Sequence, residues 1–266
     1  GTDWQRARAV CIESDDWGLC GLVPDSAALA DLDHQALVPG SLPEVYWLST
    51  LEDSAEVSQL HGVLARHRGR DGLPAVMQPN YIMASLAYQP GQADSARWLP
   101  RELPAVPRRY VRPGLWAAVA RAQLAGVWHP ELHGRWHYDP QMRRARTTGP
   151  VVRRAAAAQI LPFPGSERSW ELGPWRTPES LAAELDASLD AFRRLFGRRP
   201  VAVMGPDYVW NDAHENLWLS RGLRVIQGQR QQRKPHWRGW RGRLEKVVHR
   251  TWTRWARRDR VYLDRN

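Results

Sequence analysis

The sequence predicts an α/β fold with a mostly parallel sheet, compatible with a distorted or incomplete (β/α) barrel. Three observations support this class: short apolar strands alternate with amphipathic helices, polar motifs directly follow several strands, and neither an internal repeat nor a Gly/Ser-rich linker interrupts the chain. The 266 residues are enough for one large domain with a sizeable core.

The first expected strand covers residues 8–14 and leads directly into Asp15-Asp16-Trp17-Gly18. An amphipathic helix is expected over residues 50–67, with Thr50 as its N-cap and acidic residues in its first turn. Its apolar face consists of Val57, Leu60, Val63 and Leu64.

In the middle of the chain, residues 75–84 are expected to form a second strand and residues 115–125 a helix that Gly126 ends. A third strand over residues 127–132 leads to the string HGRWH. Residues 150–175 are rich in Pro and Gly, which predicts a loop.

The clearest helix of the sequence covers residues 177–196, with Pro178 in its first turn and Gly197 at its end. Its apolar stripe consists of Leu181, Leu185, Leu189, Phe192 and Phe196. A strand (201–209), a short helix (213–220), another strand (223–227) and a final strand-like stretch (261–266) complete the expected elements.

Positive charge is concentrated at the C-terminal end. The formal net charge is +10, and residues 231–266 hold twelve Lys and Arg against three Asp and Glu. We therefore expect a nearly neutral main domain over residues 1–230 and a basic segment over 231–266, either part of that domain or appended to it. Such a segment can contact nucleic acid, an anionic membrane surface or an acidic polysaccharide, and a solvated arm is the alternative.

The composition excludes several classes of protein. No apolar run is long enough to span a bilayer and no signal peptide is recognised, although position 1 is Gly and a removed leader is compatible with the sequence. Cys11 and Cys20 are too few for a disulfide framework or a thiolate metal site. The sequence favours a cytoplasmic or membrane-surface location, and no obligate protein partner is evident.

Two adjacent carboxylates, Asp15 and Asp16, follow the first expected strand. Because neighbouring residues at a strand end point to different sides, one can bind a metal ion while the other faces a reacting water. Asp is also common in turns and helix caps, and for such a pair taken alone a structural role is the more frequent one.

His133 and His137 lie four residues apart after the strand over 127–132. A helix places residues at this spacing on one face, and a tight loop can also bring them to one ion. Imidazole suits Zn, Ni, Co or Fe, and two His with one carboxylate leave coordination positions open for water and substrate.

His129 extends the spacing backwards to a helical face with three His, which is a rival geometry. Pro130 and Gly134 disfavour a regular helix there. Glu131 stands at the wrong position for the HExxH motif of zinc proteases. A lone His pair is more often structural than metal-binding.

Together, a strand-end Asp pair and a later His-x-x-x-His supply the parts of a metal-dependent hydrolase. With these motifs the sequence resembles the polysaccharide deacetylase family, the NodB-like group also called carbohydrate esterase family 4. Residues 13–16 (ESDD) are similar to its first motif, 133–137 (HGRWH) to its second and 206–208 (PDY) to its third. The strings ESDDWG, PNY and HGRWH look like a divergent branch found with surface-polysaccharide genes. The resemblance covers residues 8–230, and only its first two motifs are specific.

The resemblance implies a NodB-like (β/α) barrel and a role for each matching residue. Asp15 would be the catalytic base. Asp16, His133 and His137 would hold one divalent metal ion, with zinc expected and cobalt or nickel compatible. The backbone N–H of Tyr208 would help to hold the oxyanion.

Two departures from the family pattern bear on the mechanism. The Arg that orients the base in the third motif falls on Met204, and Asp207 is inserted before the tyrosine, so Arg135 is a candidate substitute. The late His that serves as general acid is not found in its usual context. The available residues are His214, His236 and His249. A truncated sequence is the preferred explanation, ahead of an acid from elsewhere or a lost activity.

The fifteen Trp residues bear on ligand binding, because aromatic faces stack on sugar rings and on nucleobases. The candidates for substrate binding next to the motifs are Trp17, Arg135, Trp136, Asp207 and Trp210. Packing in the core is the alternative for each Trp. In the basic segment, Arg alternates with Trp237, Trp240, Trp252 and Trp255, as in a clamp on an anionic chain or an amphipathic stretch at a membrane.

The sequence thus predicts a metal-dependent hydrolase that removes acetyl, N-acetyl rather than O-acetyl, from a carbohydrate or polysaccharide. Two other classes stay open: binding of nucleic acid or another anionic polymer through residues 231–266, and a non-catalytic carbohydrate-binding relative. A metal hydrolase acting on another amide or ester would use the same site.

Overall fold

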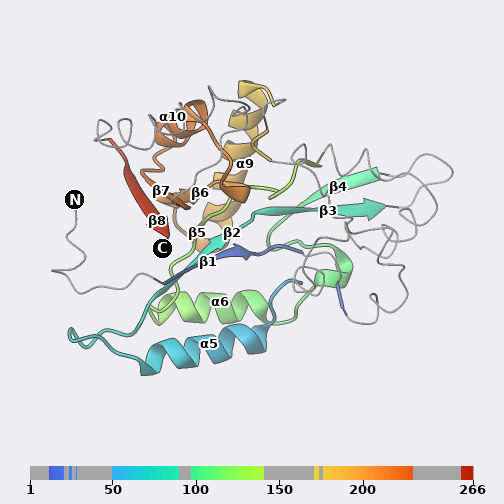
Figure 1. The fold of residues 1–266 in the computed structure, drawn as a ribbon. Coiled ribbons are helices and arrows are strands. Elements are labelled where there is room, and N and C mark those ends of the chain that lie inside the picture. Colours follow the sequence, from blue (N-terminus) through green and yellow to red (C-terminus); the bar gives the residue numbers. More distant parts are fainter. Residues whose placement is uncertain are drawn as a thin grey trace.

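The computed structural model describes residues 12–20, 24–25, 28, 50–89, 97–140, 171–173, 176–229 and 259–265. Its main sheet has six parallel strands in the order β1-β2-β5-β6-β7-β8. These are β1 (Ile12–Trp17), β2 (Met77–Tyr81), β5 (Glu131–Leu132), β6 (Ala202–Met204), β7 (Val225–Gln229) and β8 (Val261–Arg265). The sheet is curled into a half-barrel (Figure 1), which confirms the predicted α/β class and its incomplete barrel.

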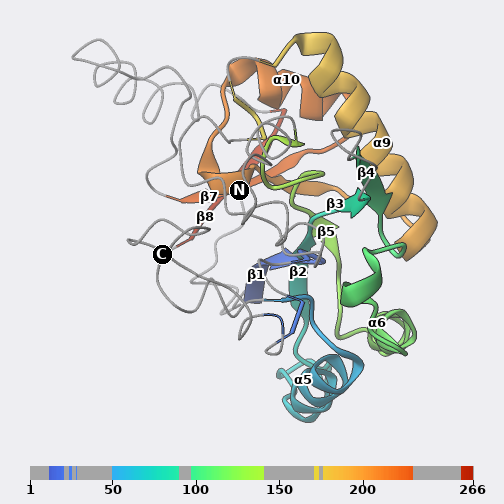
Figure 2. The same cartoon turned by 90° about the vertical axis from the view of Figure 1, so that its right-hand side faces the viewer.

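Four helices cover one face of this sheet. They are α5 (Ser54–Arg66), α6 (Leu115–Leu124), α9 (Pro178–Phe196) and α10 (Asp212–Ser220). Figure 2 shows them following one another in an arc, from α5 and α6 at the bottom to α10 at the top. Two short 3₁₀ turns, η1 (Arg108–Tyr110) and η3 (Pro206–Tyr208), lie between the larger elements.

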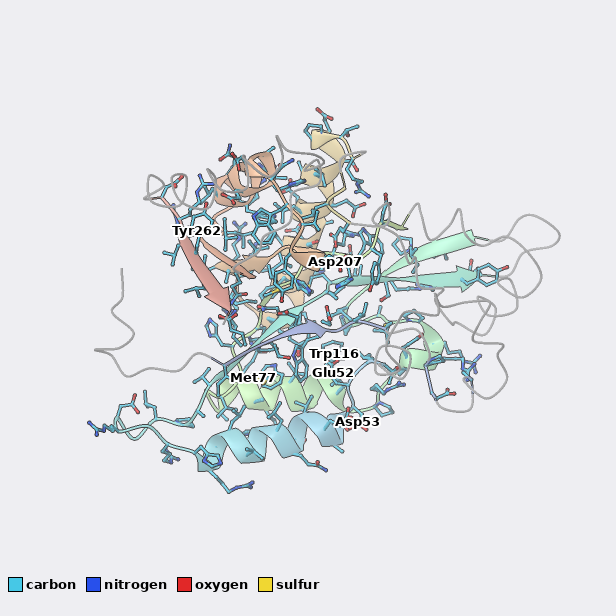
Figure 3. All side chains as sticks on the ribbon, viewed as in Figure 1. Glu52, Asp53, Met77, Trp116, Asp207 and Tyr262 are labelled. Atoms are coloured by element: carbon cyan, nitrogen blue, oxygen red, sulfur yellow. The ribbon has the colours of Figure 1, made fainter. Side chains whose placement is uncertain are left out.

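The main core fills the space between the sheet and these helices. Strand residues Met77, Tyr81, Leu132, Val203 and Ile226 belong to one buried cluster with apolar residues of all four helices. Figure 3 shows this layer of side chains between the strands and the helices, with Met77 and Trp116 labelled beside α6. Because one sheet face is used for the core, polar strand residues such as Asn80 lie on the opposite face.

The predicted helix over residues 50–67 begins later than expected, because Asp53 rather than Thr50 is its N-cap. The Asp53 carboxylate accepts the backbone N–H groups of Ala55 and Glu56, both at 2.8 Å. The Glu56 carboxylate in turn accepts the backbone N–H of Asp53, which completes a capping box.

Three other helix predictions are confirmed with nearly the same bounds. Helix α9 is capped by Thr177, whose hydroxyl accepts the N–H of Ser180, and it ends at Gly197 in the left-handed conformation. Helix α6 ends at Leu124, just before Gly126. The predicted helix over residues 213–220 is α10, which begins one residue earlier.

The expected strand over residues 75–84 is divided between two sheets. Strand β2 ends at Tyr81, and β3 (Ala84–Gln89) pairs antiparallel with β4 (Arg97–Glu102) in a hairpin that the sequence analysis missed. Between them the chain leaves the main sheet and bonds a neighbouring loop: the N–H of Met83 donates to Gly134 O, and that of Ala84 donates to Arg135 O. The hairpin therefore starts beside the loop that carries the His pair.

The remaining strand predictions differ from the structure mainly in length. Within residues 127–132, only Glu131–Leu132 form a strand, preceded by a single bridge between Met77 and Trp128. Residues 201–209 divide into β6 and the turn η3. Strand β7 lies two residues further along than the expected 223–227.

The last strand, β8, joins the chain end to the main sheet. Glu215 on α10 is fully buried, and its carboxylate accepts bonds from the Arg260 guanidinium (2.9 Å) and the Tyr262 hydroxyl (2.6 Å). These bonds tie β8 to α10. Residues 231–258, which form most of the basic segment, and residues 150–170 of the loop predicted over 150–175 lie outside the described residues. In the described part of the chain, no helix has the length and apolar character needed to cross a bilayer.

The buried position of His214 predicts that the folding stability depends on pH. His214 is buried at the third position of α10, where its Nδ1 accepts the backbone N–H of Asn211 (3.0 Å), and burial lowers its pKa to about 4. Between pH 6.5 and 4 the unfolded chain therefore binds a proton that the folded chain excludes, so folding stability decreases as the pH decreases. The His214→Gln variant keeps an acceptor at this position without the titration.

We expect wild type to lose about 2 kcal/mol more of its unfolding free energy than His214→Gln between pH 7 and pH 4.5. Urea unfolding at the two pH values measures this difference. Equal losses in the two proteins would contradict the assignment.

Candidate metal centre

Three side chains of the kind that bind metal ions meet at the carboxyl edge of the main sheet. Asp16 lies near the end of β1, and His133 and His137 lie in the loop after β5. Each imidazole Nε2 is 3.1 Å from the same Asp16 oxygen, Oδ1. The three ligand atoms lie within 4.8 Å of one another, so this group could hold a metal ion. Since parallel strands end at one edge, the fold brings together residues that are 117 positions apart.

The surroundings of these side chains fit a metal ion. Both imidazoles are buried, whereas the Asp16 side chain is 46% exposed and leaves an approach from solvent. His133 Nδ1 lies 3.3 Å from the carbonyl oxygen of Met204, which can only accept a hydrogen bond. With the proton on Nδ1 this contact is a hydrogen bond, and the Nε2 lone pair would be available to a metal ion. Two imidazole nitrogens and one carboxylate oxygen are a donor set that zinc and similar ions prefer.

The charges of the three groups are strongly coupled. Burial opposes ionisation of Asp16, but the charges and hydrogen bonds of His137 and His133 outweigh it and hold the pKa of Asp16 well below its usual range. Burial alone would lower the pKa of His137, but Asp16 raises it to about 9. A metal ion bound by these atoms therefore has to displace a proton from the site.

The backbone around this group is strained. Four non-glycine residues in the described ranges have positive φ angles: Asp16 (63°), His137 (66°), Asp207 (55°) and Tyr208 (56°). Two of them are the candidate ligands themselves, and the other two lie in η3 at the same edge of the sheet. Such conformations cost on the order of 1–3 kcal/mol each and persist mainly at functional sites.

The Asp15 carboxylate is oriented by two neutral donors. Its Oδ1 accepts a hydrogen bond from the Asn80 side-chain amide, and its Oδ2 accepts one from the Tyr208 hydroxyl, both at 3.1 Å. The register with β2 shifts between Ser14 and Trp17, the stretch of β1 that holds both carboxylates. The sequence analysis did not single out Asn80 for this position.

The Arg135 guanidinium, the candidate substitute for the arginine missing from the third motif, pairs with two acidic side chains. It pairs with Glu102 (2.8 Å) and Glu184 (2.9 Å) and lies over the ring of Trp136. Arg135 is 9% exposed, so its charge is used inside the protein.

Tyr208 faces the site with its side chain. Its backbone N–H donates to the carbonyl oxygen of Gly205 at 3.0 Å within the turn η3. That N–H is therefore engaged, and the hydroxyl is the group of Tyr208 that reaches Asp15. Asp207, its half-buried neighbour, is among the charges that raise the pKa of His137 (Figure 3).

The three Trp residues near the motifs pack inside the protein. The Trp136 and Trp210 side chains are buried, and their indole N–H groups donate to Glu184 and Glu215, respectively. Trp17 is half-buried and packs edge-on against Trp128, with ring centroids 4.8 Å apart. For Trp136 and Trp210 the burial and the internal N–H partners favour the packing alternative over the sugar-stacking role expected from sequence.

Of the three His considered as the general acid, only His214 is among the described residues. Its ring caps α10 and packs near Trp218, so it serves that helix rather than the edge where Asp16 lies. His236 and His249 lie outside the described residues.

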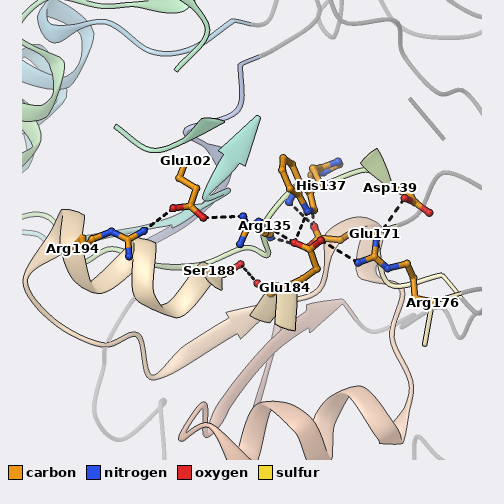
Figure 4. A network of polar contacts seen from close by, with 10 residues as sticks. Glu102, Arg135, His137, Asp139, Glu171, Arg176, Glu184, Ser188 and Arg194 are labelled. Atoms are coloured by element: carbon orange, nitrogen blue, oxygen red, sulfur yellow. Dashed lines mark hydrogen bonds and ion pairs between the residues drawn. The ribbon is translucent and has the colours of Figure 1, made fainter. Parts of the chain in front are cut away.

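A buried carboxylate that the sequence analysis missed lies behind the His loop. The Glu171 side chain accepts the backbone N–H groups of three consecutive residues, 135 to 137 (Figure 4). Its segment read only as a Pro- and Gly-rich loop, and Gly134 was the one local signal of a close approach. A Cβ on Gly134 would lie 2.8 Å from Glu171 Oε2 and 3.0 Å from Pro206 Cγ.

No protein-family model and no curated protein matches the sequence. Solved structures similar to the chain include a polysaccharide deacetylase from Bacillus cereus, at 10% identity and a TM-score of 0.36. That match covers 83% of this chain, which spans 56% of the length of the Bacillus cereus protein. They also include IcaB from Ammonifex degensii, at 12% identity and a TM-score of 0.33, with 73% of this chain and 83% of that chain covered. Both matches have low sequence identity.

Replacing Gly134 by Ala tests how tightly the His loop is held. Gly134 and Gly197 both have positive φ angles, of 87° and 70°, but a Cβ on Gly197 would meet no atom within 4 Å. We expect Gly197→Ala to cost about 1 kcal/mol of unfolding free energy for the left-handed backbone alone. Gly134→Ala should cost clearly more, because Glu171 is held by three hydrogen bonds and cannot move away freely. Urea unfolding of both variants measures the difference, and equal costs would contradict the close packing.

Proposed function

We propose that this protein is a metal-dependent hydrolase that removes acetyl groups from a carbohydrate. The observation that carries the proposal is the metal-type group of Asp16, His133 and His137, with the oriented carboxylate of Asp15 next to Asp16 in the chain. A carboxylate beside a metal site, but not part of it, is the arrangement that hydrolysis of an amide or ester requires. The acetylated carbohydrate, N-acetyl rather than O-acetyl, is the substrate class that the motif resemblance implies.

Asp16, His133 and His137 would hold the ion, for which zinc is the first candidate and cobalt or nickel are compatible. When bound, the ion supplies Lewis acidity to the acyl carbonyl and to the attacking water. The open side of Asp16 is where substrate would approach, because both imidazoles are enclosed.

Asp15 would accept the proton of the attacking water. Each of its oxygens already accepts one bond, from Asn80 or from Tyr208, and a carboxylate oxygen has a second lone pair that can take the proton. Asn80 is fully buried, and the Tyr208 backbone is fixed in η3, so the two donors hold Asp15 in one orientation. They would do the orienting that an arginine does in the family pattern.

The same carboxylate can return the proton to the leaving group. The water oxygen forms a bond to the acyl carbon while its proton passes to Asp15. Asp15 then protonates the sugar nitrogen, the carbon–nitrogen bond breaks, and acetic acid and a free amine leave. This sequence balances without a second acid, which suits a site where His214 is used as a helix cap.

Metal content tests the ligand set. We expect wild type loaded with zinc to contain about one ion per chain, and Asp16→Ala to lose it, because the ligands form one folded site. Asp186→Ala is the matched control: Asp186 is 52% exposed, pairs with Arg221 and lies away from the site. Mass spectrometry of the three proteins gives the stoichiometry, and equal metal in wild type and Asp16→Ala would rule out the proposed ligands.

Asp15→Asn tests the base separately from the metal. Its amide keeps the size of the carboxylate but cannot accept the proton, so we expect normal metal content and a loss of kcat of about 10²–10⁴-fold. Acetate release from N-acetylated oligosaccharides is the measurement. Wild type that binds metal and sugar but releases no acetate would instead identify a non-catalytic carbohydrate-binding protein.

A further inference from the structure

The loop that carries the His pair is folded around one buried carboxylate. Glu171 is 5% exposed, and its Oε1 accepts the backbone N–H of Arg135 at 2.8 Å. Its Oε2 accepts the N–H groups of Trp136 (3.0 Å) and His137 (2.8 Å). Figure 4 shows this group between the His loop and α9.

Three consecutive N–H groups can converge on one anion only in an unusual backbone. In a strand, successive N–H groups point to opposite sides, whereas here positive φ angles at Gly134 (87°) and His137 (66°) bracket the converging groups. This is the nest geometry that binds anions elsewhere. All three bonds are buried, so removal of the acceptor would leave N–H groups without partners at a substantial cost.

The two His differ in how their positions are fixed. His133 is held through its ring, which bonds Met204 O, and through its backbone N–H, which bonds Tyr81 O. The Nδ1 of His137 is buried and has no hydrogen-bond partner in the described part of the chain. Apart from the contact with Asp16, which both rings share, His137 therefore depends on its backbone for its place, and its backbone N–H is bonded to Glu171.

The charged side chains around Glu171 form ion pairs with one another. The Glu171 carboxylate instead accepts hydrogen bonds from backbone N–H groups. The ion pairs form a row in which basic and acidic side chains alternate (Figure 4). In order, its members are Arg194, Glu102, Arg135, Glu184, Arg176 and Asp139. Among the described residues no Lys or Arg side chain forms an ion pair with Glu171, so its charge is offset first by the three N–H groups and then by nearby His137.

We infer that Glu171 is the positioning residue that places His137 as a metal ligand, by fixing the backbone of residues 134–137. This inference rests on the proposed metal site. Glu171 acts on the metal only through the loop, as supporting residues outside the ligand set do in other metal sites. In the Glu171→Gln variant an N–H₂ group would replace one carboxylate oxygen and would face backbone donors.

Measuring metal affinity shows whether Glu171 positions His137 or only contributes to the stability of the fold. We expect Glu171→Gln to weaken binding of zinc and cobalt by about 10–100-fold, as loss of such supporting contacts does. The matched control is Glu215→Gln, which neutralises another fully buried carboxylate that contacts Trp210, Arg260 and Tyr262 instead of the His loop. It should lower the thermal stability and leave the metal affinity within threefold of wild type. Competition with a chelator gives the dissociation constants.

Hydrogen exchange of the metal-free proteins makes the test independent of the metal. Amides of residues 135–137 should exchange faster in Glu171→Gln than in wild type, while those of α5 remain unchanged. Glu171→Asp keeps the charge with a shorter reach and serves if Glu171→Gln fails to fold; it should show a smaller change in the same direction.

Unchanged exchange and affinity in Glu171→Gln, or an equal loss of affinity in Glu215→Gln, would overturn the inference. Wild type without metal would remove the proposed function instead, and the exchange data would still decide whether Glu171 holds the loop.

Discussion

Nε2 atoms of both His133 and His137 lie 3.1 Å from one oxygen of Asp16, and this contact sets what the rest of the structure has to supply. Two buried imidazoles and an ionised carboxylate are stable together only if their charges and lone pairs are satisfied. The parallel sheet provides the meeting point, because β1 and β5 end at the same edge. The donor set then determines the chemistry, since the same atoms that share a proton can share a metal ion.

The surroundings hold this contact against a cost in backbone strain. Asp16, His137, Asp207 and Tyr208 all adopt left-handed conformations, which non-glycine residues avoid. Glu171 offsets part of that cost by accepting three buried N–H groups of the His loop. The backbone of the His loop is thus strained at His137 and stabilised by its hydrogen bonds to Glu171. This is expected where a fixed geometry of the side chains is maintained at a cost in folding stability.

Local patterns in the sequence were sufficient for the fold class, because strand ends and an apolar stripe are recorded over a few neighbouring positions. The grouping of Asp16, His133 and His137 as ligands of one ion also needed the resemblance of their motifs to those of a known family. The hairpin β3–β4 was missed because its first strand continues directly from β2 with no turn signal. Glu171 and Asn80 could not be predicted, since their partners lie 34 to 36 and 65 residues away, respectively. Trp210 shows the converse: a residue next to a motif points into the core because its N–H is bonded by Glu215.

The most direct test of the account is a crystal of the zinc-loaded protein, measured on both sides of the zinc absorption edge. The account predicts one anomalous peak, within bonding distance of the Asp16 carboxylate and of Nε2 in His133 and His137, at about 2.0–2.2 Å. Asp15 should lie outside the ligand set, with its bonds to Asn80 and Tyr208 intact. An anomalous peak elsewhere in the protein, or none between these three side chains, would contradict the proposed metal centre and with it the hydrolase.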